Sequence, residues 1–295
     1  MKIGVDLPAA EGSEGPPLPS WEDVRTYARS AEAAGLDSVW MFDHFFYRRD
    51  DGTIQNMYES WTILSALAAV TDRISLGTLV MCGTFRNPGL LAKMAATLDE
   101  VSGGRLVLGI GAGWYDPEHE AFGFPTDRRG SRYAETLEVV RRLLDGGQVT
   151  FDGEFHRVRD AVLTPAPPRR IPILVAGDGP RVLRLAARYA DAWNINGFGL
   201  PDERLTDVLG ELDEALDAEG RDRASIERTI GVTVRHPDVT VDQSDEPAFQ
   251  GDAAAMATMF QAYADLGVDH LILEAGPKTG ASIEWIAEAI ERFTR

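Results

Sequence analysis

The stretch from Ile74 to Pro125 constrains the fold most, because it alternates strand and helix patterns without interruption. A short apolar and β-branched run at 74–80 is followed by Asn87-Pro88, a helix N-cap with proline at the first helical position. Apolar residues then recur at helical spacing until Gly103-Gly104 ends the helix, and 105–110 has the pattern of a second strand. A strand, a helix and a strand within about 40 residues predict a βαβ unit with parallel strands.

The same alternation continues along the rest of the chain. Further strands are predicted at 3–7, 37–42, 171–176, 191–195, 229–234 and 268–273, and each is followed by a segment with helical spacing. Eight such units predict an α/β fold closed into a (β/α)8 TIM barrel with loop insertions. Residues 149–155 alternate around Asp152-Gly153 and predict a small β-hairpin after the fourth unit. Because no linker or internal repeat is visible, residues 1–295 are expected to form a single barrel domain.

Composition and charge exclude several classes of partner. The chain has 295 residues, of which 44% are hydrophobic, so it can bury a large core. No apolar run reaches the roughly 18 residues of a membrane span, and Met1 to Gly4 leads directly into a strand rather than a signal peptide. Cys82 is the single cysteine, which excludes an internal disulfide and favours the cytoplasm. A net charge of −18 argues against nucleic acid and anionic lipid as partners.

The predicted carboxyl ends of the strands carry polar residues and glycines, and this is the rim at which barrel enzymes build their active sites. Gly109, Gly111 and Gly113 either let the backbone approach a ligand closely or simply turn the chain. They do not form a dinucleotide-binding G-x-G-x-x-G motif, because Trp114 occupies the third glycine position. Cys82 has no basic neighbour in the sequence and is interpreted as a small pocket-lining residue.

His44 is the strongest candidate for acid–base chemistry. It directly follows a predicted buried strand, and an imidazole titrates near the working pH. The alternative is a histidine that only caps a loop. The other four histidines have structural interpretations, and no His or carboxylate spacing predicts a metal site.

The segment from Gly177 to Arg181 is a candidate phosphate site. Gly177 and Gly179 allow backbone N–H groups to turn towards an anion, and Pro180 fits the first position of a helix whose N-terminus favours negative charge. Arg181, Arg184 and Arg188 fall on one stripe of that helix. The alternative is an ordinary helix with a solvated arginine face.

A longer match supports the pocket interpretation. The run from Arg86 to Trp114, followed by Glu118-His119 and 121–123, resembles the luciferase-like monooxygenase superfamily, and most closely the branch that uses the deazaflavin coenzyme F420. The resemblance implies a barrel with insertions and a homodimer. It also implies that an Asp-His pair after strand two faces the deazaflavin, with His44 handling a proton and Asp43 helping to hold the cofactor. A non-proline cis peptide is expected at Leu79-Val80.

The resemblance further implies an oxidoreductase that transfers a hydride between F420 and a small organic substrate. The residues expected to contact the cofactor are Asp43, Leu79, Val80, Cys82, Ala112, Gly113, Ala176, Gly177, Gly179, Pro180 and Arg181. Two alternatives stay open, namely a monooxygenase on the same barrel that uses reduced FMN, and a non-catalytic flavin-binding protein. Trp114 stands where some F420 relatives carry an acidic residue, which leaves the substrate open.

Overall fold

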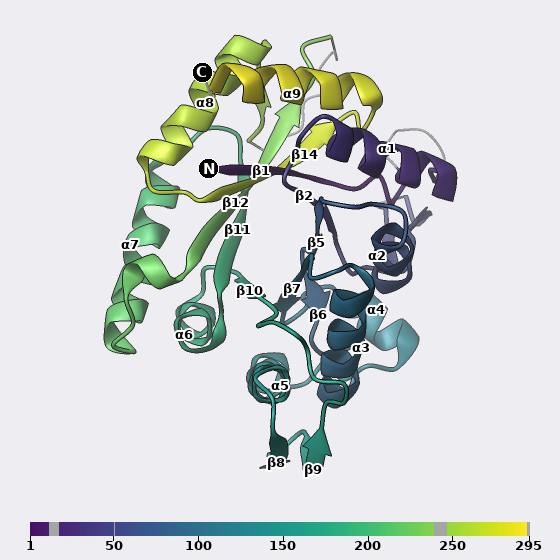
Figure 1. Ribbon diagram of the computed structural model, residues 1–295, viewed down its shortest axis with the longest axis vertical. Coiled ribbons are helices and arrows are strands. Elements are labelled where there is room, and N and C mark those ends of the chain that lie inside the picture. The colour runs from purple at the N-terminus through teal and green to yellow at the C-terminus, as the bar shows by residue number, and fades with distance from the viewer. Residues whose placement is uncertain (12–17, 50, 239–246, 294–295) are drawn as a thin grey trace.

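The computed structural model describes residues 1–11, 18–49, 51–238 and 247–293, and its centre is a closed parallel barrel (Figure 1). The barrel strands follow one another in sequence order: β1 (Lys2–Asp6), β2 (Ser38–Met41), β5 (Ser75–Thr78), β7 (Leu106–Gly111), β10 (Ile173–Ala176), β11 (Ala192–Phe198), β12 (Glu227–Arg235) and β14 (His270–Gly276). Parallel pairing of β7 with β10 and of β14 with β1 closes the ring. The predicted (β/α)8 fold is therefore confirmed.

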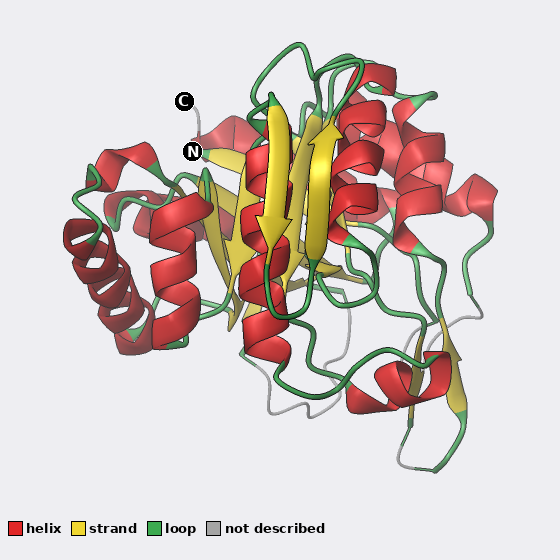
Figure 2. Cartoon of the chain, turned by 90° about the horizontal axis from the view of Figure 1, so that it is seen from below, coloured by secondary structure: helices red, strands yellow, loops and turns green. Residues whose placement is uncertain are grey.

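Helices cover the outside of the barrel, as Figure 2 shows from a second direction. They are α1 (Trp21–Ala33), α2 (Ser60–Ala68), α3 (Pro88–Val101), α5 (Arg129–Leu144), α6 (Pro180–Tyr189), α7 (Glu203–Ala218), α8 (Ala253–Asp265) and α9 (Gly280–Phe293). Several begin where the sequence supplies a cap. Ser20 and Asp23 form a capping box before α1, and the Asn87 side chain accepts backbone N–H groups of Gly89 and Leu90 before α3.

In the described part of the chain, several short elements were not predicted from the sequence. Five of them are the antiparallel pair β3 (Phe46–Arg48) and β4 (Ile54–Asn56), the short strands β6 (Met81–Cys82) and β13 (Phe249–Gln250), and the helix α4 (Asp116–Phe122). β3, β6 and α4 lie in the connections that follow β2, β5 and β7. All three therefore shape the rim at the carboxyl ends of the strands.

The hairpin after the fourth unit exists, but its predicted turn is wrong. The strands are β8 (Gln148–Asp152) and β9 (Arg157–Val162), so four residues connect them instead of a tight Asp-Gly turn. The cause is Glu135 on α5, whose carboxylate accepts the backbone N–H groups of Glu154, Phe155 and His156 at 2.8–2.9 Å. These contacts hold residues 154–156 in the connection, so the second strand begins only at Arg157.

Apolar side chains fill the barrel interior below its open rim. Trp40, Leu174, Ala192 and Ile272 form a small buried cluster, separate from the larger core between strands and helices. Gly77 makes room for this cluster, since a Cβ atom there would lie 2.1 Å from the Trp40 ring. This cluster fills the middle of the barrel, and a pocket opens at the carboxyl ends of the strands, where barrel enzymes place their active sites. Among the described residues, no helix is both long and apolar enough to cross a membrane.

Candidate active site

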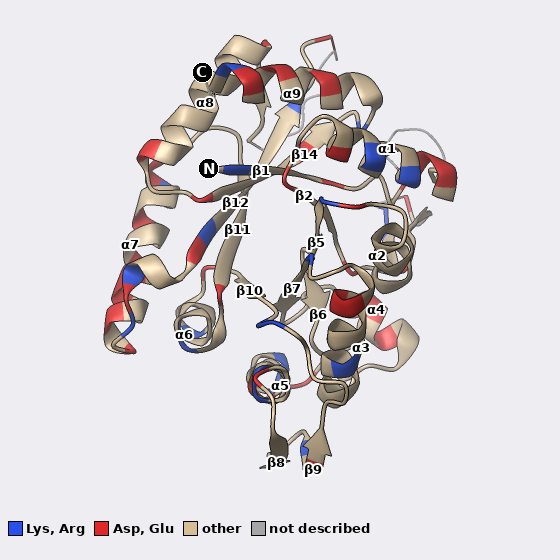
Figure 3. Ribbon diagram, viewed as in Figure 1, with Lys and Arg blue, Asp and Glu red and all other residues tan. Residues whose placement is uncertain are grey.

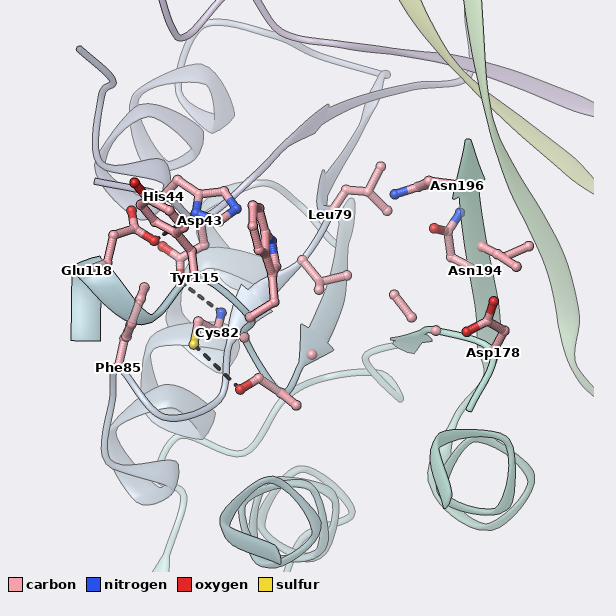
Figure 4. A pocket seen from close by; sticks show the side chains of 18 of the residues that line it. Asp43, His44, Leu79, Cys82, Phe85, Tyr115, Glu118, Asp178, Asn194 and Asn196 are labelled. Carbon is pink, nitrogen blue, oxygen red and sulfur yellow. Dashed lines mark hydrogen bonds and ion pairs between the residues drawn. The ribbon is translucent and has the colours of Figure 1, made fainter. Parts of the chain in front are cut away.

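A pocket of about 410 Å³ opens at the carboxyl ends of β2, β5, β7, β10 and β11 (Figure 4). The predicted site residues that line it are Asp43, His44, Leu79, Val80, Cys82, Ala112, Gly113, Ala176 and Gly177. These residues come from four separate strand–helix connections, so the barrel brings them together. Gly179, Pro180 and Arg181 are not part of the lining.

His44 is held by a buried carboxylate that the sequence analysis did not assign to the site. The Oε2 atom of Glu118, on α4, lies 2.8 Å from Nδ1 of His44, and Glu118 is 1% exposed. The Oε1 atom of the same carboxylate accepts the backbone N–H groups of Phe45 and Phe46. A carboxylate in its ionised form can only accept hydrogen bonds, so we assign the ring proton of His44 to Nδ1. Nε2 is then the nitrogen left to exchange a proton with a ligand.

Asp43 is anchored by hydrogen bonds within the protein. Its carboxylate accepts two N–H groups of Arg86, at 2.6 and 3.1 Å, the Ser60 hydroxyl at 2.9 Å and the backbone N–H of Cys82 at 2.9 Å. Arg86 also donates to Glu59. This network ties the end of β2 to the start of α2 and to β6, and it fixes the backbone that presents His44. A direct contact between Asp43 and a cofactor stays a prediction.

The pocket floor lies where β5 and β7 approach each other closely. The Leu79-Val80 peptide bond is cis, as expected from the family resemblance. A Cβ atom at Gly111 would lie 2.6 Å from Cγ2 of Val80, and one at Gly109 would lie 1.9 Å from the Thr78 carbonyl oxygen. These two glycines therefore permit close packing of the floor, beyond any role in turning the chain.

Cys82 fits its interpretation as a pocket-lining residue. Burial raises the pKa of its thiol, and its Sγ lies 3.1 Å from the Thr84 hydroxyl. A raised pKa keeps the sulfur protonated and poorly nucleophilic. Gly113 has a φ of +76°, and a Cβ atom there would lie 2.4 Å from Sγ, so glycine is required at that position.

Asn194 on β11 offers an unused acceptor on the far side of the pocket from His44 (Figure 4). Its side chain is fully buried, and its Nδ2 donates to the carbonyl and hydroxyl oxygens of Thr229 at 3.1 and 2.9 Å. Its Oδ1 has no hydrogen-bond partner. A buried unpaired acceptor is costly, and it indicates a place for a ligand N–H or O–H donor.

The candidate phosphate segment stands beside this pocket. Gly177 has a φ of +126°, and Gly179 caps α6 without a side-chain hydrogen bond. Arg181 is exposed and donates to the Ser131 hydroxyl at 3.1 Å, and Arg184 and Arg188 are also exposed. In Figure 3, Lys and Arg colour parts of α5 and α6, and Asp and Glu also lie on α5, in a protein with a net charge of −18. A phosphate contact at this segment stays a prediction.

Two of the other histidines make hydrogen bonds within the protein, and one of them, His119, also lines the pocket. His119 lies on α4 rather than in a loop and contacts the Thr84 hydroxyl at 2.8 Å, and His270 bonds Ser38 and Glu227 inside the barrel. Across the described part of the chain, no group of three or more His, Cys, Asp or Glu side chains is arranged to hold a metal ion.

Comparison with known proteins places this geometry in a family. The model of the luciferase-like monooxygenases matches residues 1–275. The chain belongs to the luciferase-like monooxygenase family. It is 39% identical over 240 residues to the F420-dependent glucose-6-phosphate dehydrogenase of Kineococcus radiotolerans, covering 79% of this chain and 67% of that protein. The protein of the same name from Intrasporangium calvum is 37% identical over 213 residues, covering 70% and 63%. The chain thus spans about two thirds of the length of these curated relatives.

Solved structures share this fold over nearly the full length of the chain. An F420-dependent secondary alcohol dehydrogenase in complex with an F420-acetone adduct superimposes with a TM-score of 0.83 at 21% identity, covering 99% of this chain and 98% of that one. The monooxygenase RslO1 from Streptomyces bottropensis gives a TM-score of 0.79 at 21% identity, with both chains fully covered. At these identities the likeness establishes the barrel alone.

Proposed function

We propose that this luciferase-like protein is an F420-dependent oxidoreductase that moves a hydride between the coenzyme and a small organic substrate. The curated relatives named F420-dependent glucose-6-phosphate dehydrogenase support the choice of cofactor. The observation that carries the proposal is His44, which faces the pocket while Glu118 fixes its Nδ1 proton. This arrangement leaves Nε2 free to give or take the proton that accompanies a hydride transfer.

The lining fits a flat ring system with donors at its edge. Leu79, Val80, Ala112 and Ala176 supply an apolar surface, and Oδ1 of Asn194 supplies a buried acceptor without a partner. We assign contacts with the ring to these residues, together with Asp43, Cys82 and Gly113. Gly177, Gly179, Pro180 and Arg181 are assigned to the phosphate-bearing part of the coenzyme. When bound, the deazaflavin supplies the hydride chemistry, which no side chain offers.

The protein's own part in the reaction is proton handling, orientation and exclusion of water. Nε2 of His44 donates a proton when the substrate is reduced and accepts one when the substrate is oxidised. Glu118 stabilises the doubly protonated imidazole with a charge-assisted hydrogen bond. The Asp43–Arg86 pair holds the β2 end in place, so His44 meets the ligand in a fixed orientation.

Parallel titration with F420 and FMN tests the proposal. A protein with a net charge of −18 must bind a polyanionic coenzyme through a local basic surface, so binding should weaken as salt rises. We expect F420 to bind with a Kd in the micromolar range or below and clearly more tightly than FMN. Tighter FMN binding, with oxygen consumed in the presence of reduced FMN, would instead support a monooxygenase. Failure to bind either would support a protein without redox activity.

A further inference from the structure

Two aromatic rings lie beside the imidazole of His44. The Tyr47 ring centroid lies 4.6 Å from that of His44, and the Trp114 centroid lies 5.6 Å from it at 71°. Trp114 lines the pocket, yet 64% of its surface is exposed. A large apolar side chain left open beside a proton-handling residue is a surface that a ligand would cover.

Positive charge is scarce at the same place. Among the described residues, Arg204 is the one cation in the pocket lining, and it belongs to α7, which follows β11. Its guanidinium lies over the Phe198 ring at 4.6 Å and 3.8 Å from Asp178. The charged residues that line the pocket near His44 are the carboxylates Asp43, which is paired with Arg86 behind it, and Glu118. The sequence has no Lys or Arg at 12–17, 50 or 239–246.

The neighbouring strand ends β1 and β14 add two further carboxyl groups, those of Asp6 and Glu274. Val5 on β1 pairs with Leu273 on β14, and Asp6 and Glu274 are the next residues on these two adjacent strands. Lys278 is bound to the Asp6 carboxylate, so its charge is already matched. Burial, and then Glu118, Tyr115 and Glu274, raise the pKa of Tyr47, which keeps its hydroxyl neutral. Among the described residues that line the pocket, a dianionic phosphate would therefore meet no unpaired cation beside His44.

We infer that the substrate is an uncharged carbonyl compound, or the corresponding alcohol, whose flat apolar group packs on Trp114, and that it is not a phosphorylated sugar. This inference rests on the F420-dependent function proposed above. In the reducing direction, the carbonyl carbon accepts a hydride supplied by the reduced deazaflavin. The C=O π pair moves to oxygen, which takes the proton from Nε2 of His44. The carbonyl is reduced, the deazaflavin is oxidised, and the reverse reaction oxidises the alcohol.

Trp114 is therefore assigned as the residue that selects the substrate. Acetophenone and 1-phenylethanol serve as flat apolar probes, and glucose 6-phosphate serves as the anionic probe. Trp114→Ala should raise KM for the apolar probes roughly tenfold or more while kcat changes by less than about threefold, because uniform binding is lost. Trp114→Phe should restore most of the affinity. Leu90→Ala on α3 is the matched control, since Leu90 is 55% exposed and does not line the pocket.

Calorimetric binding of the same probes to the F420-loaded protein gives a readout that does not depend on turnover. We expect saturable binding of acetophenone that Trp114→Ala weakens and Leu90→Ala does not, with no binding of glucose 6-phosphate. Tighter binding of glucose 6-phosphate, no binding of either probe class, or an unchanged acetophenone affinity in Trp114→Ala would overturn the inference. A failure of the proposed function can be told apart from a failure of this inference, because the wild-type protein would then not bind F420 at all.

Discussion

Replacing Glu118 by glutamine should invert the tautomer of His44. Oε1 of Glu118 accepts two backbone N–H groups, from Phe45 and Phe46, and Oε2 faces Nδ1 of His44. In Glu118→Gln the amide oxygen must stay with the two backbone donors, because turning it away leaves them unpaired at about 1–3 kcal/mol each. The amide NH2 group then takes the place of Oε2 and donates to Nδ1. The ring proton is forced to Nε2.

The size of the effect follows from the lost charge. A hydrogen bond to a charged group contributes about 1.5–3 kcal/mol, so loss of the carboxylate should destabilise the doubly protonated His44 by that amount. Turnover should fall roughly 10- to 150-fold at saturating F420 and substrate, since about 1.4 kcal/mol corresponds to a tenfold change in rate. F420 affinity should stay nearly constant, because Glu118 acts through His44.

Nitrogen-15 NMR of the histidine rings, together with steady-state kinetics, checks both parts. In the neutral ring, we expect the proton on Nδ1 in the wild type and on Nε2 in Glu118→Gln. Glu120→Gln is the control, because it makes the same chemical change at an exposed position of the same helix. The reasoning is refuted if the same nitrogen carries the proton in both proteins and turnover differs by less than about twofold.

Two further predictions concern stability and pH. Burial, opposed by Lys278, raises the pKa of Asp6 to about 7, so the wild type should lose stability relative to Asp6→Asn as the pH rises from about 4 to 7, by up to about 1.4 kcal/mol per pH unit. Chemical unfolding at pH 4.5, 6 and 8 measures this difference, and a constant difference would contradict it. Burial would raise the pKa of Glu227, but hydrogen bonds from His270 and Lys2 outweigh it and lower that pKa to about 2. Glu227→Gln should therefore be less stable than the wild type by about 1–3 kcal/mol near pH 7, and this difference in unfolding free energy should disappear as the pH falls from about 4.5 towards 2. Unfolding curves that give the same difference at every pH would contradict this prediction.

The barrel could be predicted because its signals are local. Asn87-Pro88, Gly103-Gly104 and the Ser20 capping box mark helix ends through contacts within one turn, and the structure places α1 and α3 there. Parallel strands alternating with helices leave few ways to close the sheet. The prediction of the hairpin turn was wrong because Glu135, about twenty residues earlier in the chain, binds the backbone of the connection. A contact of that range leaves no local pattern.

The site was predicted only in part for the same reason. The place of His44 in the pocket was predicted from its strand position, and the cis Leu79-Val80 peptide bond was predicted from the family resemblance. Glu118 was part of the matched motif, yet its role depends on α4, a short helix that carries it back to β2. Arg86 lies inside the matched run, and its pairing with Asp43 spans 43 residues. Side chains so far apart in the sequence become neighbours only in the folded barrel, so the sequence alone does not predict their contact.

His44→Ala tests the central claim most directly. We expect turnover to fall by roughly 100-fold or more at saturating F420 and substrate, because general acid–base catalysis by a positioned histidine contributes about that much. The Kd for F420, measured on the same variant, should change by less than about threefold. Unchanged turnover would remove His44 from the mechanism, and a large loss of F420 affinity with normal turnover at saturation would make it a binding residue instead.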